Sequence, residues 1–319
     1  MNEQDIINYL KNPNTTKLQG FIFRLNYSEL KRKVTEGIQV EKLMSMNSEY
    51  THKRKYFDVL FRLSVLFNET DKLRYSILID PKLILDTVIN KYQTKLFNFN
   101  SNQLIVSSEE IIIEIECLDE RDTFIFKIYS LNESSIIRLK SEIEAVKSFN
   151  QSVISNVEEC QITNTIINTT YILNLLNLIM EDYHSPGRTY SLFSGITSQN
   201  KNLLLGMIKT SNLAFQKNED CFFVSSIAQC SLFVENRLAD IYERENGSYN
   251  DDKTLGQLIG ELKHAGHLNG IDIPLERFKD IRNNLIHYHR RTFNLYNSFI
   301  ETISYFGQFL IWCEDNGYL

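Results

Sequence analysis

The chain is poor in the residues that interrupt regular structure, with 4 prolines and 12 glycines among 319 residues. Because turns and irregular loops depend on these residues, their scarcity predicts a chain rich in helices and strands. No apolar run reaches the roughly 18 residues that a membrane-spanning helix needs. The first residues, MNEQDIINYLKN, also lack the basic-then-apolar order of a secretory signal. We therefore expect a cytoplasmic protein that is not attached to a membrane.

Cysteine is scarce, and its spacing suggests no pairs: the 5 cysteines are odd in number, lie far apart in the sequence and form no CxxC motif. This argues against a disulfide framework and against a zinc cage. Glu261, His264 and His267 have helical spacing and allow a metal-site interpretation, but no fourth ligand is evident and surface histidines are the ordinary alternative. The chain also has no GxxxxGK[ST], GxGxxG or GxSxG motif, which disfavours nucleotide-driven motors, dinucleotide-binding enzymes and α/β-hydrolases. We expect neither a metal nor a cofactor.

Excess positive charge is absent too, since the net charge is −6. A binding site for a polyanion would therefore have to be a local basic patch.

Hydrophobic periodicity divides the chain into two parts. In YFDVLFRLSVLF (56–67), apolar residues alternate with polar ones, which predicts a half-buried strand. Further strands are expected at 73–79, 103–106, 110–118 and 123–130, with a helix over 82–94 that begins after Pro81. From about residue 133 the period becomes helical. Helices are predicted at 133–148, 161–182, 221–245, 254–266 (with a glycine cap at Gly266), from Pro274 through 291, and at 292–313, with a loop at 184–200. The predicted class is α+β: a domain with an antiparallel sheet over 1–150, then an all-α bundle over 151–319.

The stretch IRNNLIHYHRR (281–291) gathers polar groups on one side of a predicted helix. At 100° per residue, an apolar stripe forms from Phe278, Ile281, Leu285 and Tyr288. The opposite side carries Asn283, His287, Arg290 and Arg291, with Lys279 close by and Arg282 at the edge. Over 276–291, five basic residues outnumber two acidic ones.

This set of groups suits phosphodiester chemistry. A histidine titrates near neutral pH and can move the proton of a 2′-hydroxyl or of a leaving oxygen. An arginine offers a planar fork of donors to phosphate oxygens. The alternative is a solvated helix face with incidental histidines, and the charge pattern alone does not exclude it.

Arg282-Asn283-Asn284-Leu285-Ile286-His287 resembles the Arg-polar-x3-His motif (R-x4-6-H) of the HEPN superfamily, and the order of helices over about 200–319 is similar to many HEPN domains. HEPN domains are helical bundles, and many are metal-independent endoribonucleases of toxin–antitoxin, abortive-infection and CRISPR-linked antiviral defence. The N-terminal half resembles no family, and we expect it to act in sensing or recruitment.

The resemblance implies a homodimer in which two motifs form one composite site. His287 would be the general acid or base, Arg282 would stabilise the scissile phosphate, and Asn283 would position either one. Lys279, Arg290 and Arg291 would bind RNA, and Tyr288 and Glu235 would support the site, with Glu235 steadying Arg282 or His287. The RNA 2′-hydroxyl would attack, leaving a 2′,3′-cyclic phosphate.

The motif departs from one HEPN variant, R-x4-H-x-Tyr, in which a partner enzyme modifies the tyrosine. Here His289 stands two residues beyond His287, so silencing of that kind is not expected, although a protein inhibitor or a phage-derived trigger is compatible with the family. The main alternative is a non-catalytic HEPN-like binding or antitoxin-type module. A third interpretation is a purely structural helical protein.

Overall fold

The computed structural model describes residues 2–14, 16, 18–35, 54–69, 96–100, 103–107, 111–118, 122–161, 165–180, 190–248, 253–286 and 294–319. The chain divides into two compact units. One, the sheet unit, comprises Lys17–Thr163, and the other, the helical unit, comprises Met1–Thr16 together with Asn164–Leu319. The class is α+β, as the sequence predicts.

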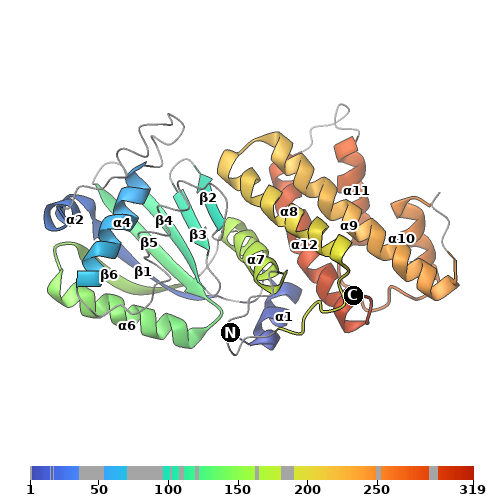
Figure 1. The fold of residues 1–319 in the computed structure, drawn as a ribbon, viewed down its shortest axis with the longest axis horizontal. Helices are drawn as coiled ribbons and strands as arrows, with labels where there is room; N and C mark the ends of the chain where they lie inside the picture. Colours follow the sequence, from blue (N-terminus) through green and yellow to red (C-terminus); the bar gives the residue numbers. More distant parts are fainter. Residues whose placement is uncertain are drawn as a thin grey trace. The chain divides into compact units, whose positions relative to one another are not determined.

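The sheet unit is built on a single antiparallel sheet (Figure 1). Its described strands are β1 (Gln19–Asn26), β2 (Leu96–Asn100), β3 (Gln103–Ser107), β4 (Ile112–Leu118), β5 (Thr123–Ser130) and β6 (Ile154–Gln161). They lie in the order β2-β3-β4-β5-β1-β6, with every neighbouring pair antiparallel. The strands predicted near 103–106, 110–118 and 123–130 are confirmed as β3, β4 and β5.

Aromatic residues on alternate strand positions form the core of this unit. Phe21, Phe23 and Leu25 of β1 are fully buried, and the residues between them are not. Phe23 lies opposite Phe126 of β5, and the two rings stack with centroids 4.9 Å apart. Such a pair contributes about 0.5–1.5 kcal/mol beyond the area that it buries, so it helps to fix the register of β1 against β5.

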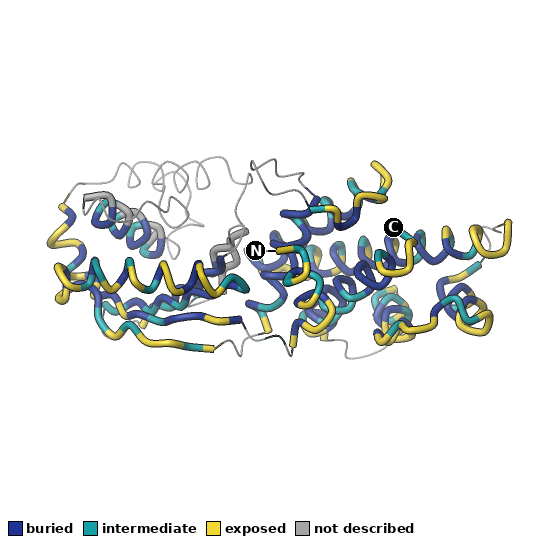
Figure 2. Tube along the Cα trace, turned by 90° about the horizontal axis from the view of Figure 1, so that it is seen from below, coloured by how far each residue is buried: buried dark blue, intermediate teal, exposed yellow. Residues whose placement is uncertain are grey.

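Helices α2 (Tyr27–Lys33), α4 (Arg54–Glu69) and α6 (Glu133–Phe149) complete the sheet unit. Figure 2 shows α4 and α6 on the same side of the sheet. Their buried faces join the inner face of the sheet in one hydrophobic cluster. The helix predicted at 133–148 is therefore confirmed.

The strand predicted within 56–67 is wrong, because this stretch is the helix α4. The buried residues follow steps of three and four: Tyr56, Val59, Leu60, Leu63, Leu66 and Phe67. The run is so rich in apolar residues that it matches a period of two as well as a period of 3.6. Packing on the sheet decides between them, and the Asp58–Arg62 ion pair at 2.8 Å adds helical i,i+4 support. The predicted elements at 73–79 and 82–94 lie outside the described residues.

The helical unit contains α1 (Glu3–Lys11), α7 (Thr165–Met180), α8 (Ser198–Lys217), α9 (Asp220–Asn246), α10 (Leu255–His264), α11 (Leu275–Ile286) and α12 (Leu295–Asp315). The helices predicted at 161–182, 221–245, 254–266 and 292–313 are confirmed, with ends that shift by a few residues. The helix predicted from Pro274 through 291 is confirmed over Leu275–Ile286, and residues 287–291 lie outside the described residues. Gly266 has φ +80° just beyond α10, as expected of a glycine cap. The predicted loop at 184–200 ends sooner than expected, since Thr197 caps α8. None of the described helices is long and apolar enough to cross a membrane.

The predicted domain boundary at 150/151 differs from the division in the structure in two ways. Residues 1–16 belong to the helical unit, because Tyr9 and Leu10 are buried there and the Tyr9 hydroxyl donates to Asn168 Oδ1 of α7 at 2.9 Å. Gly307 of α12 lets α1 approach, since a Cβ at this glycine would lie 3.3 Å from Leu10. The strand β6, which pairs with β1, extends the sheet unit beyond residue 150.

Candidate functional site

The helix α11 carries the motif, and its buried side is fixed by two residues. Phe278 and Ile281 are both fully buried, and Phe278 lies against Tyr305 of α12 with ring centroids 6.1 Å apart. Both belong to the apolar stripe predicted from the sequence. Leu285, the next member of that stripe, is only partly buried; it is the second-last described residue of α11.

Arg282 emerges beside this buried stripe and meets the acid expected to steady it. Its Nη2 donates to Glu235 Oε2 of α9 at 2.9 Å. The side chains are 31% and 19% exposed, respectively, so the pair lies at the surface but is partly shielded from water. The guanidinium is therefore anchored at one of its N–H groups and still accessible.

Asn283 follows Arg282 and faces solvent. Its side chain makes no hydrogen bond within the part of the chain that the structure describes. An exposed amide with free donors can bind a phosphate or a second polar side chain. Asn283 thus lies next to Arg282, as the motif requires.

Four of the predicted site residues lie outside the described residues, namely His287, Tyr288, Arg290 and Arg291. His289 lies there too. Their predicted roles rest on the sequence alone.

The basic patch predicted over 276–291 is largely compensated where the structure describes it. Arg277 binds Glu301 of α12 through two hydrogen bonds of 2.9 Å each, and Lys279 pairs with Glu276. Arg282 has Glu235 as its partner. The sequence count missed this compensation because Glu301 and Glu235 are remote in the chain and approach only in the folded helical unit.

Exposed apolar residues flank the Arg282–Glu235 pair on both helices. Ile286, one turn after Arg282 on α11, is 60% exposed. Leu232, one turn before Glu235 on α9, is 47% exposed. Single exposed apolar residues are common on protein surfaces, so these positions show that apolar side chains are available next to the pair for a contact with another molecule.

The alternative metal site near α10 receives no support. Glu261 accepts from Lys253 Nζ at 2.6 and 2.8 Å, while His267 Nδ1 lies 3.7 Å from Glu245. Across the residues that the structure describes, no three histidine, cysteine, aspartate or glutamate side chains gather as metal ligands.

Comparison with known proteins identifies no relative of this chain. No protein-family profile matches the chain, and neither a curated protein nor a solved structure is significantly similar to it.

Proposed function

We propose that the helical unit is a metal-independent endoribonuclease of the HEPN type, which cleaves RNA through the 2′-hydroxyl in a homodimer. The observation that carries the proposal is the arrangement around Arg282. An accessible arginine is oriented by Glu235 at 2.9 Å and lies next to the exposed amide of Asn283, within a motif whose histidine follows at helical spacing.

Arg282 is the phosphate-binding and charge-stabilising group in this proposal. A guanidinium has five N–H donors, and Glu235 engages one of them. The others are available for the oxygens of a scissile phosphate, where negative charge builds up as the 2′-hydroxyl attacks. Because Glu235 holds the guanidinium in place, less orientational freedom is lost when RNA binds.

His287 transfers the protons, and Asn283, four residues earlier on the same predicted face, positions it or the phosphate. Lys279, Arg290 and Arg291 bind the neighbouring phosphates. When RNA binds, Lys279 leaves its ion pair with Glu276 and pairs with a phosphate instead. Because the Lys279–Glu276 pair is exposed, breaking it costs little. Tyr288 supports the motif. No metal or cofactor takes part in this chemistry.

A homodimer brings two motifs together. Ile286 and Leu232, which flank the Arg282–Glu235 pair, provide the apolar contacts of such an interface. The sheet unit acts as a sensor or recruitment domain, and the biological setting is antiviral defence by abortive infection or a toxin–antitoxin pair in the cytoplasm. A protein inhibitor or a phage-derived trigger would control the activity.

A second candidate is a non-catalytic HEPN-like module that binds a partner. One observation favours it: Arg277, Lys279 and Arg282 each have an acidic partner, so the described part of α11 offers little net positive charge to RNA. Under this alternative the exposed apolar residues serve binding alone.

Cleavage assays distinguish the two candidates. Purified wild-type protein and the variants Arg282→Ala and His287→Ala are incubated with a mixture of tRNA and mRNA in the presence of EDTA. If the protein is the proposed ribonuclease, the wild type cleaves the RNA and both variants fail to cleave it. Arg244→Ala is a matched control, because it removes an exposed arginine of the same unit whose main contact is the carbonyl of Gly317. RNA that stays intact with every protein leaves two options, the binding module and an enzyme that stays silent until its trigger arrives, and a search for the partner then follows.

A further inference from the structure

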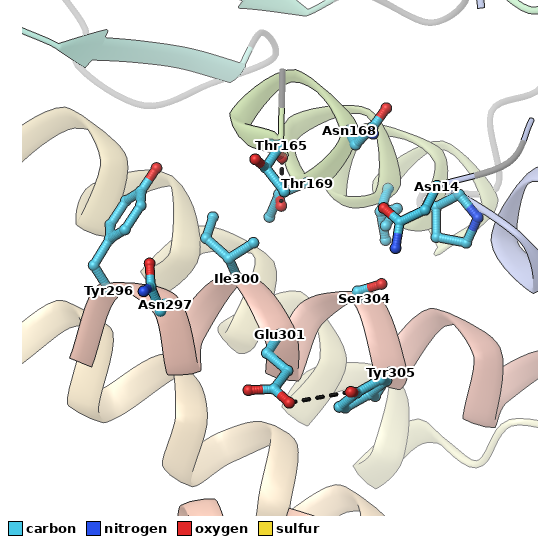
Figure 3. A pocket seen from close by; sticks show the side chains of 12 residues that line it. Asn14, Thr165, Asn168, Thr169, Tyr296, Asn297, Ile300, Glu301, Ser304 and Tyr305 are labelled. Atoms are coloured by element: carbon cyan, nitrogen blue, oxygen red, sulfur yellow. Dashed lines mark hydrogen bonds between the residues drawn. The ribbon is translucent and has the colours of Figure 1, made fainter. Parts of the chain in front are cut away.

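The helical unit contains a pocket of about 310 Å³ that the proposed ribonuclease does not use. It lies between α7 and α12, and Pro13 and Asn14, shortly after α1, line one part of it (Figure 3). The volume is at the lower end of the range of small-molecule sites, which is about 300–1,000 Å³.

Most of the residues that line it carry a neutral polar group. Amides come from Asn14, Asn168 and Asn297, and hydroxyls include those of Thr165 and Ser304. Among the described residues that line the pocket, Glu301 is the one charged residue, and there is no lysine, arginine or histidine. An anionic ligand would therefore meet the carboxylate of Glu301 and no cation of the described lining. Arg277 lies outside the lining, and two of its donors are directed at Glu301, so it leaves phosphates and carboxylates disfavoured.

Several of these groups have hydrogen-bonding capacity to spare. Asn168 Oδ1 accepts from the Tyr9 hydroxyl at 2.9 Å, which fixes the amide and leaves both its N–H donors unused. The side chains of Asn14, Asn297 and Ser304 make no hydrogen bond within the described ranges. The pocket thus offers both donors and acceptors in defined positions.

Glu301 is a rigid acceptor at the edge of the pocket. Arg277 donates to both of its oxygens, and the Tyr305 hydroxyl donates to Oε1 at 3.1 Å (Figure 3). A carboxylate has about four acceptor positions, so one remains, on Oε2. The hydrogen bonds from Arg277 lower the pKa of Glu301, which keeps the group ionised.

One wall of the pocket also carries an unsatisfied group. The hydroxyl of Tyr296 is buried and has no partner among the described residues, while its ring contacts Phe223 edge-on. A buried hydroxyl without a partner is unfavourable, and a ligand or an ordered water that reaches it would remove this cost.

We infer that this pocket binds an uncharged small molecule of about the size of a nucleoside or a monosaccharide. The ligand carries several hydrogen-bond donors and acceptors, one donor being an amino or hydroxyl group directed at Glu301 Oε2. Nucleosides and sugars share this chemistry. Because Arg277 lies on α11, Glu301 connects the pocket to the helix that carries Arg282. The inference is independent of the proposed ribonuclease activity.

Binding to the full chain tests the inference. Two arms, a panel of four ribonucleosides and a panel of common monosaccharides, are screened by saturation-transfer NMR and then titrated by calorimetry. We expect a ligand from one arm to bind with a dissociation constant below about 1 mM. Its monophosphate ester should bind at least several-fold more weakly, because the described lining has a carboxylate and no cation.

Variants locate the site. Asn297→Ala combined with Ser304→Ala removes two free polar groups and should weaken binding about tenfold or more. Gln308→Ala, one turn further along α12 and outside the pocket, should leave binding unchanged. Thermal melts confirm that both proteins fold. The inference is overturned if no compound in either arm binds, if the double variant binds as tightly as wild type, or if the phosphate ester binds as well as the neutral ligand.

Discussion

Arg282 of α11 and Glu235 of α9 are 47 residues apart in sequence and are joined by a hydrogen bond of 2.9 Å. The bond ties the motif helix to the longest described helix of the unit. It also fixes the direction of a guanidinium that remains accessible to a ligand.

This relationship predicts different consequences for the two partners. Arg282→Ala removes the proposed phosphate-binding group and should reduce RNA cleavage by about a hundredfold or more. Glu235→Gln only loosens the guanidinium and should reduce cleavage by about tenfold. Since the pair is partly exposed, neither change should cost more than about 1 kcal/mol in the free energy of unfolding. Glu243→Gln, an exposed position on α9, is the matched control. An equal loss of cleavage in this control would remove the special role of Glu235.

The docking of α1 should be essential for the helical unit. Leu10→Ala deletes a fully buried side chain next to Gly307, which typically costs about 2–5 kcal/mol. Lys11→Ala, which breaks only an exposed pair with Asp315, should cost less than about 1 kcal/mol. Urea unfolding measures both, and hydrogen exchange should show weaker protection in α12 for Leu10→Ala. Equal stability of the two variants would show that α1 is not docked.

The helical character of α4 can be tested by a side chain that a strand would expose. Leu60 lies on the polar side of the alternating pattern, yet it is 3% exposed in the structure. Leu60→Ala should therefore cost about 2–5 kcal/mol, whereas Val65→Ala, at a partly buried position, should cost clearly less. Chemical denaturation of both variants gives the comparison. A larger loss of stability for Val65→Ala than for Leu60→Ala would instead support a strand over 56–67.

Cysteine reactivity should report on burial. Cys221 is exposed, and Cys117, Cys230 and Cys313 are buried; burial raises the pKa of the Cys230 and Cys313 thiols. A maleimide reagent at neutral pH should label Cys221 first, Cys160 more slowly, and the three buried thiols only after denaturation. Mass spectrometry counts the labels, and Cys221→Ser should abolish the fast phase. Rapid labelling of Cys230 in the native protein would contradict the burial of this residue in the core of the helical unit.

The Arg277–Glu301 pair predicts a stability difference that depends on pH. Hydrogen bonds from Arg277 hold the pKa of Glu301 below its usual value of 4.5. A carboxylate with a lowered folded-state pKa stabilises the fold above its unfolded-state pKa, and this contribution is lost as pH falls through the folded-state pKa. With Glu301 27% exposed, the contribution is at most about 1 kcal/mol. The wild type should therefore be more stable than Glu301→Gln near neutral pH, and this difference should disappear in acid. Thermal melts of both proteins across a pH series measure it. An advantage that persists in acid would contradict the ionic origin.

Much of the fold follows from local patterns, and the exceptions have physical reasons. The strand β5 buries alternate residues over most of its length, and the charged sequence LDERD (118–122) separates it from β4. The helix α9 keeps its apolar residues at helical spacing. The stretch that forms α4 matches both the period of a strand and the period of a helix, so only its contacts with the sheet decide which of the two it forms. The strand β6 fully buries only Ile154 and so carries little hydrophobic pattern of its own.

The same distinction applies to the candidate site. The side of α11 on which Arg282 and Asn283 lie could be predicted from the positions of Phe278 and Ile281. The pairing of Arg277 with Glu301 could not, because it joins residues 24 positions apart through the packing of α11 against α12. The pocket beside Glu301 was missed for the same reason: its lining comes from three separate segments.

The chemistry of the RNA ends tests the central claim most directly. Wild-type protein and His287→Ala are incubated with a defined RNA in EDTA, and the 3′ ends of the products are identified by mass spectrometry. The account predicts 2′,3′-cyclic phosphate ends from the wild type and no cleavage by the variant. Equal cleavage by both proteins, or products that end in a 3′-hydroxyl, would contradict it.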